Sequence, residues 1–459
     1  MRHKSHNIFP ALFNNDESIN GSVNKNVQHY RDVYKTIDAY LVQYPEIEQL
    51  AHDDLKTLCK PNPTRRRTPN FTTQNLFRAV LVTKMEGLDF RGAEIEIAEK
   101  LTLQNFCRLN KKTTISFQLI DQASIALSAE TWQHLNRFFA DRMVAEEKIN
   151  VDYIRSDGTV VETNIHWPTD SSLCYDVYRT VDRIVNNARE AGLGGVLRGF
   201  RFHVDKIKAL NFRINQNASA KSKDRKRRYK KDYETIVTRA EDVVVKADEI
   251  IRLLITQGSD VALTFAMELS RYLPWMKKIV DVARRRRNGE KVPNEEKVFS
   301  LFEPHTELIK KGKKNKPIEF GHLVFFSQTR EKFVTDFILE ERSPSETTML
   351  PEVVERHEDQ FGRKPKGIAM DKGCHPGRDE MEALLDEYED EIEVVGIPSR
   401  SNDFANEEMS VYQRFRAGIE GSISFLKRCF GLTRVYYKGF NPDISCVFCD
   451  FVFVVFAIT

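Results

Sequence analysis

The chain is poor in cysteine and contains no apolar segment long enough to cross a bilayer. Seven cysteines are scattered over 459 residues, which indicates reduced cytosolic thiols and argues against a disulfide framework. The most apolar stretch, residues 446–459, has 14 residues and includes Asp450. It is too short for a transmembrane helix and is expected to form a buried strand or helix. The first ten residues, MRHKSHNIFP, lack the apolar region of a signal peptide. We therefore expect a cytoplasmic protein with no membrane partner.

The sequence also lacks the histidine and cysteine patterns of common metal sites. It contains no HExxH motif and no second CxxC pair to accompany the CVFC segment at 446–449. That segment has apolar neighbours, and the adjacent Cys374 and His375 have no partners at ligand spacing, so neither predicts zinc. No internal repeat and no long low-complexity tract is present. Carboxylates remain as the candidate metal ligands.

Positive charge is concentrated in short tracts rather than spread over the chain. The sequence has 70 Lys and Arg against 67 Asp and Glu, a net charge of only +3. Yet eight of the eleven residues in 221–231 are basic, and further basic tracts occupy 284–287 and 310–316. Clustered cations are typical of contact with nucleic-acid phosphates, although they also occur on solvated faces. The residues of these tracts that we predict to bind DNA are Arg227, Arg228, Arg285 and Arg286.

The first third of the chain has a helical pattern throughout. At 459 residues the chain is expected to form two or three domains. Residues 1–60 become helical after a polar start, and a Pro-rich basic linker leads into 61–148. A helix capped by Thr72 or Thr73 and ended by Gly87 is predicted there. We expect 61–148 to be an all-helical DNA-binding region that reads bases from within 72–110; a plain helical bundle is the alternative.

The pattern changes to strands at Ile149 and alternates after a basic helical block. INVDYIRSDGTVVETNIHW predicts two strands that meet at an Asp157-Gly158 turn. Three helices are predicted at 172–192, 221–254 and 267–287. The strands predicted beyond them are 297–302, 307–328, 333–341, 366–371 and 391–399, and the helices are 346–365, 379–390 and 414–429. This order predicts a mixed α/β sheet with helices on its faces, interrupted by the basic block.

Three carboxylates stand in settings that suit a site. Asp157 adjoins a glycine at a predicted strand end, and Asp371 follows an apolar strand. Glu420 lies on the predicted helix 414–429, where a turn of about 100° per residue places it in one stripe with Arg416 and Lys427. Each has a plainer explanation, namely a hairpin turn, a loop acid and an i,i+4 ion pair. Together they predict a site for two divalent ions, Mg²⁺ or Mn²⁺, that catalyses phosphoryl transfer.

Four segments resemble the conserved blocks of DDE transposases from bacterial insertion sequences. They are RSDGTVVETNIHWPTDSSLCYD, EFGHLVFFSQ, AMDKGCHPGRDE and RFRAGIEGSISFLKRCFGLTRVYYKG, and the resemblance extends over about residues 60–450. The last segment is the most specific, because Arg416, Glu420 and Lys427 fit the R-x3-E-x6-K spacing of the family's YREK signature. Gln413 stands where that signature has its tyrosine, and Tyr412 precedes it.

The resemblance implies an RNase H-like catalytic domain with Asp157, Asp371 and Glu420 as the catalytic, metal-binding triad. Arg416, Lys427 and Lys372 would contact DNA phosphates beside it. The domains implied are an N-terminal helical segment at 1–60, the DNA-binding region at 61–148, the catalytic domain at 149–174 and 298–459, and a basic helical insertion at 175–297.

The activity implied is that of a transposase that binds the terminal inverted repeats of its element and catalyses metal-dependent DNA cleavage and strand transfer. Its partners would be double-stranded DNA at the element ends and at the target, and a second copy of the chain, as a homodimer on DNA. It would be a bacterial cytoplasmic protein, associated with the nucleoid when bound. Two alternatives stay open. One is an RNase H-like nuclease without strand transfer, and the other is an inactive copy, truncated within the apolar run at 446–459, that only binds DNA.

Overall fold

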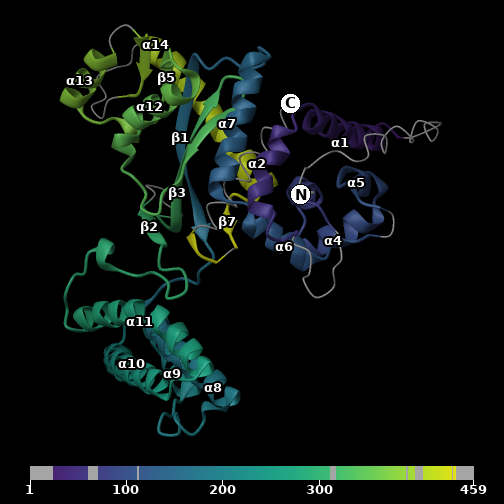
Figure 1. Cartoon of the computed structure of the whole chain (residues 1–459). Helices are drawn as coiled ribbons and strands as arrows, with labels where there is room; N and C mark the ends of the chain where they lie inside the picture. Colours follow the sequence, from purple (N-terminus) through teal and green to yellow (C-terminus); the bar gives the residue numbers. More distant parts are fainter. Residues whose placement is uncertain are drawn as a thin grey trace. The chain divides into compact units, whose positions relative to one another are not determined.

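A computed structural model describes residues 24–59, 71–110, 113–310, 317–388, 391–398, 407–436 and 438–440. The fold is mixed α/β, as expected, with helices predominating around one curled sheet (Figure 1). The chain forms two compact units, the first made of Met1–Glu162 with His322–Thr459 and the second of Thr163–Gly321. The predicted structures at 446–459, 311–316 and the linker before Phe71 lie outside the described residues. None of the described helices combines the length and apolarity needed to span a bilayer.

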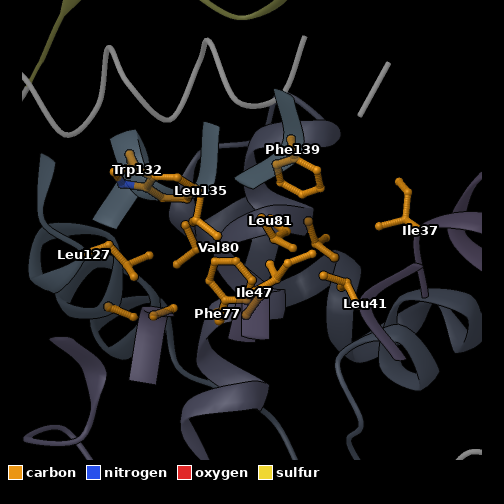
Figure 2. Packing of buried hydrophobic residues seen from close by; sticks show 14 of the residues in the cluster. Ile37, Leu41, Ile47, Phe77, Val80, Leu81, Leu127, Trp132, Leu135 and Phe139 are labelled. Atoms are coloured by element: carbon orange, nitrogen blue, oxygen red, sulfur yellow. The ribbon is translucent and has the colours of Figure 1, made fainter. Parts of the chain in front are cut away.

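The N-terminal part of the first unit is all-helical. Its helices are α1 (Lys25–Gln43), α2 (Glu46–Leu55), α3 (Thr73–Met85), α4 (Phe90–Glu99), α5 (Leu101–Phe106), α6 (Phe117–Ala126) and α7 (Ala129–Ala145). Their apolar faces share one core, in which Phe77, Trp132 and Phe139 are fully buried (Figure 2). As predicted, Thr72 caps α3, and Gly87 follows its end with a positive φ of 62°. Helix α3 is buried from Thr73 to Thr83, so within 72–110 the exposed surface belongs mainly to α4 and to the first residues of α5.

A charged network lies inside this helical core. The fully buried Arg78 of α3 bonds Asp38 of α1 at 2.5 Å and Glu48 of α2 at 2.6 Å, and Arg108 bonds Asp38 at 2.6 Å. Two cations and two carboxylates therefore compensate each other away from water. Breaking such a buried pair by removing one partner destabilises a protein strongly, because a buried charge is left without compensation.

The sheet of the first unit is built around strand β1 (Tyr153–Thr163). Its neighbours are β3 (Ile318–Thr329) on one side and β5 (Gly367–Ala369) on the other; β4 (Val334–Ile338) pairs with β3, β6 (Val394–Gly396) with β5, and β7 (Arg434–Val435) with β1. β1, β5 and β6 are parallel, whereas β3 and β4 are antiparallel to each other.

Helices cover both faces of this sheet. One face shares the core of the N-terminal helices, to which α14 (Glu407–Cys429) adds Ile419 and Leu426. The other face packs against α12 (Met349–Phe361) and α13 (Arg378–Tyr388). In the sequence, the short helix η4 (Glu346–Thr348) precedes α12, and β5 and the short helix η5 (Lys372–Cys374) lie between α12 and α13. The sheet is therefore the middle layer of the unit, as in other domains that bury both faces.

The second unit is a helical bundle with its own core. It contains α8 (Asp170–Ala188), η2 (Arg189–Leu193), α9 (Val204–Asn217), α10 (Lys223–Gln257), α11 (Asp260–Arg287), η3 (Asn294–Glu296), and β2 (Glu307–Lys310) paired with the start of β3. Gly258, in the left-handed conformation, ends α10, and Ser259 caps α11 by accepting a hydrogen bond from the Ala262 N–H. The three helices predicted from the sequence are confirmed here, and α9 was not predicted.

Two predicted elements are wrong. The residues expected to form a hairpin at Asp157-Gly158 form the single strand β1, and no strand is present at 297–302. Gly158 does not form a turn; it lies where side chains of β3 pack closely on β1. A Cβ placed there would lie 3.0 Å from Leu323 Cδ1 and 3.3 Å from Phe325 Cδ2. The segment 307–328 contains two antiparallel strands, β2 and β3. The strands predicted at 333–341, 366–371 and 391–399 are confirmed in type but are shorter, and the helices at 346–365, 379–390 and 414–429 are confirmed in type and approximate place.

Candidate functional site

Asp157 lies on β1, and Asp371 lies two residues beyond the neighbouring strand β5. β1 and β5 pair in parallel with Tyr153 opposite Gly367, Ile154 opposite Ile368 and Arg155 opposite Ala369. Continued by two residues, the same offset places Asp157 opposite Asp371. Adjacent strands are about 4.8 Å apart, so the register brings together two carboxylates that are far apart in the sequence. Asp371 directly follows the carboxyl end of β5, where sites in parallel sheets form.

The Asp157 carboxylate is largely buried and has two partners. The Gly158 N–H donates to its Oδ1 at 2.7 Å, and Arg416 of α14 lies 3.1 Å from its Oδ2. Burial raises the pKa of Asp157 to about 6; the Gly158 N–H and Arg416 lower it, and the charges of Asp371 and Glu346 raise it further. An added positive charge near Asp157 would stabilise the ionised form of this carboxyl.

Helix α14 places the third predicted acid next to this pair through Arg416. The guanidinium bonds Asp157 on one side and Glu420 on the other, at 3.2 Å. The Glu420 side chain is 65% exposed, so it can change rotamer at little cost. Lys427 donates to the Val160 carbonyl of β1 at 3.0 Å. The charged stripe predicted on this helix therefore faces β1, where Lys427 helps to fix the helix.

Contacts from the sheet hold α14 at this position. The Arg155 side chain of β1 donates to the Phe415 carbonyl at 3.0 Å and to Gln328 of β3. Gly418 is required beneath this guanidinium, because a Cβ there would collide with Arg155. Gln413 donates to the carbonyls of Met370 and Gly396 at 3.3 and 2.9 Å. The residue at the signature's tyrosine position thus supports the backbone directly before Asp371.

Glu346 joins this group although nothing in the sequence pointed to it. It begins η4, and its carboxylate lies against the backbone of Gly373, so that a Cβ at 373 would collide with it. Burial raises the pKa of Glu346, and the charge of Asp371 adds to the effect. Burial also raises the pKa of Cys374 to about 12, with further contributions from Glu346, Asp157 and Asp371. A buried thiol with a raised pKa stays protonated at neutral pH and is a poor zinc ligand.

The residues fit a divalent cation in chemistry and charge. Among the described residues, no three His, Cys, Asp or Glu side chains converge as a ready set of ligands, and Arg416 lies between Asp157 and Glu420. Hard divalent ions prefer carboxylate oxygen. Burial raises the pKa values of Asp157 and Glu346, and the charge of Asp371 adds to the effect on both carboxyls. Lys372, predicted to contact DNA, is half-buried in η5 immediately after Asp371.

The two predicted DNA-binding tracts of the second unit differ in their partners. Each arginine of 284–287 is already in an ion pair: Arg284 with Asp281, Arg285 with Glu290 and Glu296 at 2.5 Å, Arg286 with Asp170 at 2.7 Å, and Arg287 with Glu241 at 3.4 Å. These pairs join α11 to its surroundings within the unit. Arg285 and Arg286 are therefore weaker candidates for DNA contact than their sequence suggested.

The tract at the start of α10 is exposed and unpaired. Arg227 and Arg228 project from its first two turns, and no cation from 223 to 231 forms an ion pair with any described residue. Like charges four residues apart, such as Lys223 and Arg227, each destabilise a helix by about 0.2–0.5 kcal/mol. They also lie at the helix end where the macrodipole disfavours cations. Stability therefore does not explain this tract.

No protein-family model, no curated protein and no solved structure matches the chain.

Proposed function

We propose that this protein is a DDE-type transposase, with Asp157, Asp371 and Glu420 as its catalytic acids. Two observations carry the proposal. The parallel pairing of β1 with β5 brings Asp371, two residues beyond β5, close enough to act on the pKa of Asp157, and Arg416 is bonded to both Asp157 and Glu420. Asp157, in the middle of β1, is thereby connected with acids from two other parts of the sequence. A mixed sheet with the antiparallel pair β3–β4 on one side of β1 and two parallel strands on the other agrees with an RNase H-like domain.

The acids would hold one or two Mg²⁺ or Mn²⁺ ions, which when bound activate the attacking oxygen and stabilise the leaving one. The protein itself positions the three acids. Asp157 and Asp371 are fixed by the sheet, while Glu420 is on an exposed helix face and can rotate toward them. Arg416 forms ion pairs with Asp157 and Glu420, and its guanidinium could also contact a DNA phosphate beside these acids.

Binding of element ends, joining to target DNA and assembly as a homodimer belong to the same proposal. Transposition joins two ends of one element, which requires two catalytic units in one complex. The helical surfaces of the N-terminal region, α4 above all, would provide base contacts, because α3 is buried. The exposed tract at the start of α10, with Arg227 and Arg228, would add phosphate contacts.

The test compares cleavage and binding in the same full-length protein. Asp157→Asn, Asp371→Asn and Glu420→Gln should each abolish Mg²⁺-dependent cleavage of DNA that carries the element ends, while affinity for that DNA is retained. Glu355→Gln, which removes an exposed carboxylate from α12 of the same unit, is the control and should cleave normally. Full cleavage by any of the three acid variants would refute the assignment of that residue.

A second assay separates the alternatives. Pre-cleaved ends with a free 3′-OH should be joined to a target plasmid by the wild type. Cleavage without joining would identify a nuclease that does not transfer strands. Binding with no cleavage in either Mg²⁺ or Mn²⁺ would identify a copy that acts only as a DNA-binding protein.

A further inference from the structure

A polar hollow lies between α9 and α10 of the helical unit, distant in sequence from the acidic residues. Its volume is about 730 Å³, within the range of about 300–1,000 Å³ that is usual for ligand sites. The residues that line it are Arg213, Gln216, Asn217, Arg225, Arg228, Lys231 and Asp232. All seven have charged or amide side chains, and no apolar or aromatic residue is among them.

The charge of this lining is strongly positive. Four cations face one carboxylate, and that carboxylate, Asp232, is bonded by Arg213 at 3.1 Å across the two helices. The other three cations, Arg225, Arg228 and Lys231, form no ion pair with any residue that the structure describes. Donors without acceptors in a concave, polar site point to an anionic ligand, and the two amides can supply further hydrogen bonds.

The cations extend beyond the hollow in a way that fits a polymer. From Lys223 to Lys231, α10 carries seven Lys and Arg and one Asp, all exposed. At about 1.5 Å per residue this segment is roughly 12 Å long. Duplex DNA carries one phosphate charge per roughly 1.7 Å, hence about seven over the same length. A small anion would use only a few of these cations, whereas a duplex, with both strands counted, carries about as many phosphate charges over this length as the segment has cations.

The basic tract of α11 differs from that of α10, whose cations form no ion pair with any described residue. All four arginines at 284–287 are paired with carboxylates of the same unit. The same unit thus neutralises one basic tract and leaves the other open. We propose that the hollow between α9 and α10, with the first turns of α10, is a binding site for the phosphate backbone of duplex DNA. Only the identity of the nucleic acid as DNA rests on the proposed function.

The experiment measures binding of the full-length chain, in EDTA, to a duplex of arbitrary sequence over a series of salt concentrations. The test variant is Arg225→Gln with Arg228→Gln. The control is Arg239→Gln with Arg252→Gln, which removes the same charge from exposed positions further along α10. Each lost phosphate contact lowers the log–log salt slope by about 0.9, so the test variant should lose about 1.8 in slope and up to roughly 60-fold in affinity at 0.1 M salt.

The control variant should bind as the wild type, and Arg225→Lys with Arg228→Lys should restore most of the affinity because phosphate contact needs the charge. Equal affinity and slope in the test variant and the wild type would overturn the inference. So would equal losses in test and control variants, which would show a general charge effect. Stronger dependence of duplex RNA than of duplex DNA on the two arginines would reassign the site to RNA. Saturable binding of inorganic phosphate, lost in the test variant while DNA affinity is unchanged, would reassign it to small anions.

The outcome is separable from that of the proposed function. Glu355→Gln should bind this duplex as the wild type does, because Glu355 is an exposed residue of α12 that does not line the hollow. If the arginine variants bind normally while the wild type cleaves element ends, the hollow has no part in DNA binding and the transposase assignment stands. If the arginine variants lose affinity while the acid variants keep full cleavage, the catalytic assignment fails and the phosphate site stands.

Discussion

Replacing Asp157 with asparagine is expected to stabilise the protein at neutral pH when no divalent ion is present. Burial raises the pKa of this carboxyl from 3.8 to about 6, so between these values the folded state keeps a proton that the unfolded state releases. The stability that Asp157 contributes is therefore fully present below pH 3.8 and is lost as the pH rises to about 6. Asparagine resembles the protonated carboxyl and is not subject to this loss.

The size of the effect follows from the same numbers. A pKa difference of 1 corresponds to about 1.4 kcal/mol, so ionisation of Asp157 costs at most about 3 kcal/mol of stability. Its side chain is 18% exposed, and the substitution removes the charged partner of Arg416. We therefore expect a net gain of about 1–2 kcal/mol above pH 7, which corresponds to a rise in Tm of about 4 °C for a unit of this size.

Thermal unfolding in EDTA at pH 4 and at pH 7.5 measures this difference. Asp336→Asn is the matched control, because Asp336 is 16% exposed and is bonded through both oxygens by Arg356; this variant should lose stability at pH 7.5. Mg²⁺ should raise the Tm of the wild type and leave that of Asp157→Asn unchanged. A variant that melts at or below the wild-type temperature at pH 7.5, or whose advantage persists at pH 4, would refute the reasoning.

Other substitutions test the neighbouring groups. Glu346→Gln removes a charge that raises the pKa of Asp157, so the decline of stability with pH should move to lower pH in the same unfolding series; an unchanged midpoint would contradict the proximity of the two acids. Arg416→Gln removes a cation that lowers this pKa, so the decline should move to higher pH, and cleavage should weaken without being abolished. Arg78→Met leaves buried carboxylates without their cation and should destabilise the N-terminal helices by about 3–5 kcal/mol, measured by urea unfolding. A loss below about 1 kcal/mol would show that the network relaxes.

Local signals predicted much of the secondary structure. Thr72 capped its helix as expected, and the long periodic segments at 221–254 and 267–287 formed α10 and α11. The Asp-Gly pair misled the prediction of β1, because a glycine required by a neighbouring strand looks the same in a sequence as a glycine required by a turn. Tertiary packing, which a single sequence does not display, decided that case.

In the candidate site, too, some residues could be predicted from the sequence and others could not. Asp371 was recognised because an apolar strand precedes it, and the Arg416 stripe because helical spacing aligns it. Glu346 escaped notice because its proximity to Asp371 arises only when η4 and η5 pack together. The charge tracts were equivalent in sequence, and only their partners in space distinguish Arg285 from Arg228.

In the sequence, the helical unit lies between two strands that pair with each other, and this order affects how the chain folds while it is being translated. β1 ends at the start of this unit, and most of its neighbour β3 follows the unit's end, with Thr163–Gly321 between them. At about 5–20 residues per second, a ribosome needs on the order of 10 s to translate that interval. The helical unit, whose contacts are local, can fold during this time, while β1 waits with an unpaired edge. Four polar residues, Arg155, Ser156, Asp157 and Thr159, interrupt the apolar pattern of β1, so Asp157 and Arg155, which belong to the acidic site or support it, are also among the residues expected to protect the nascent strand from aggregation.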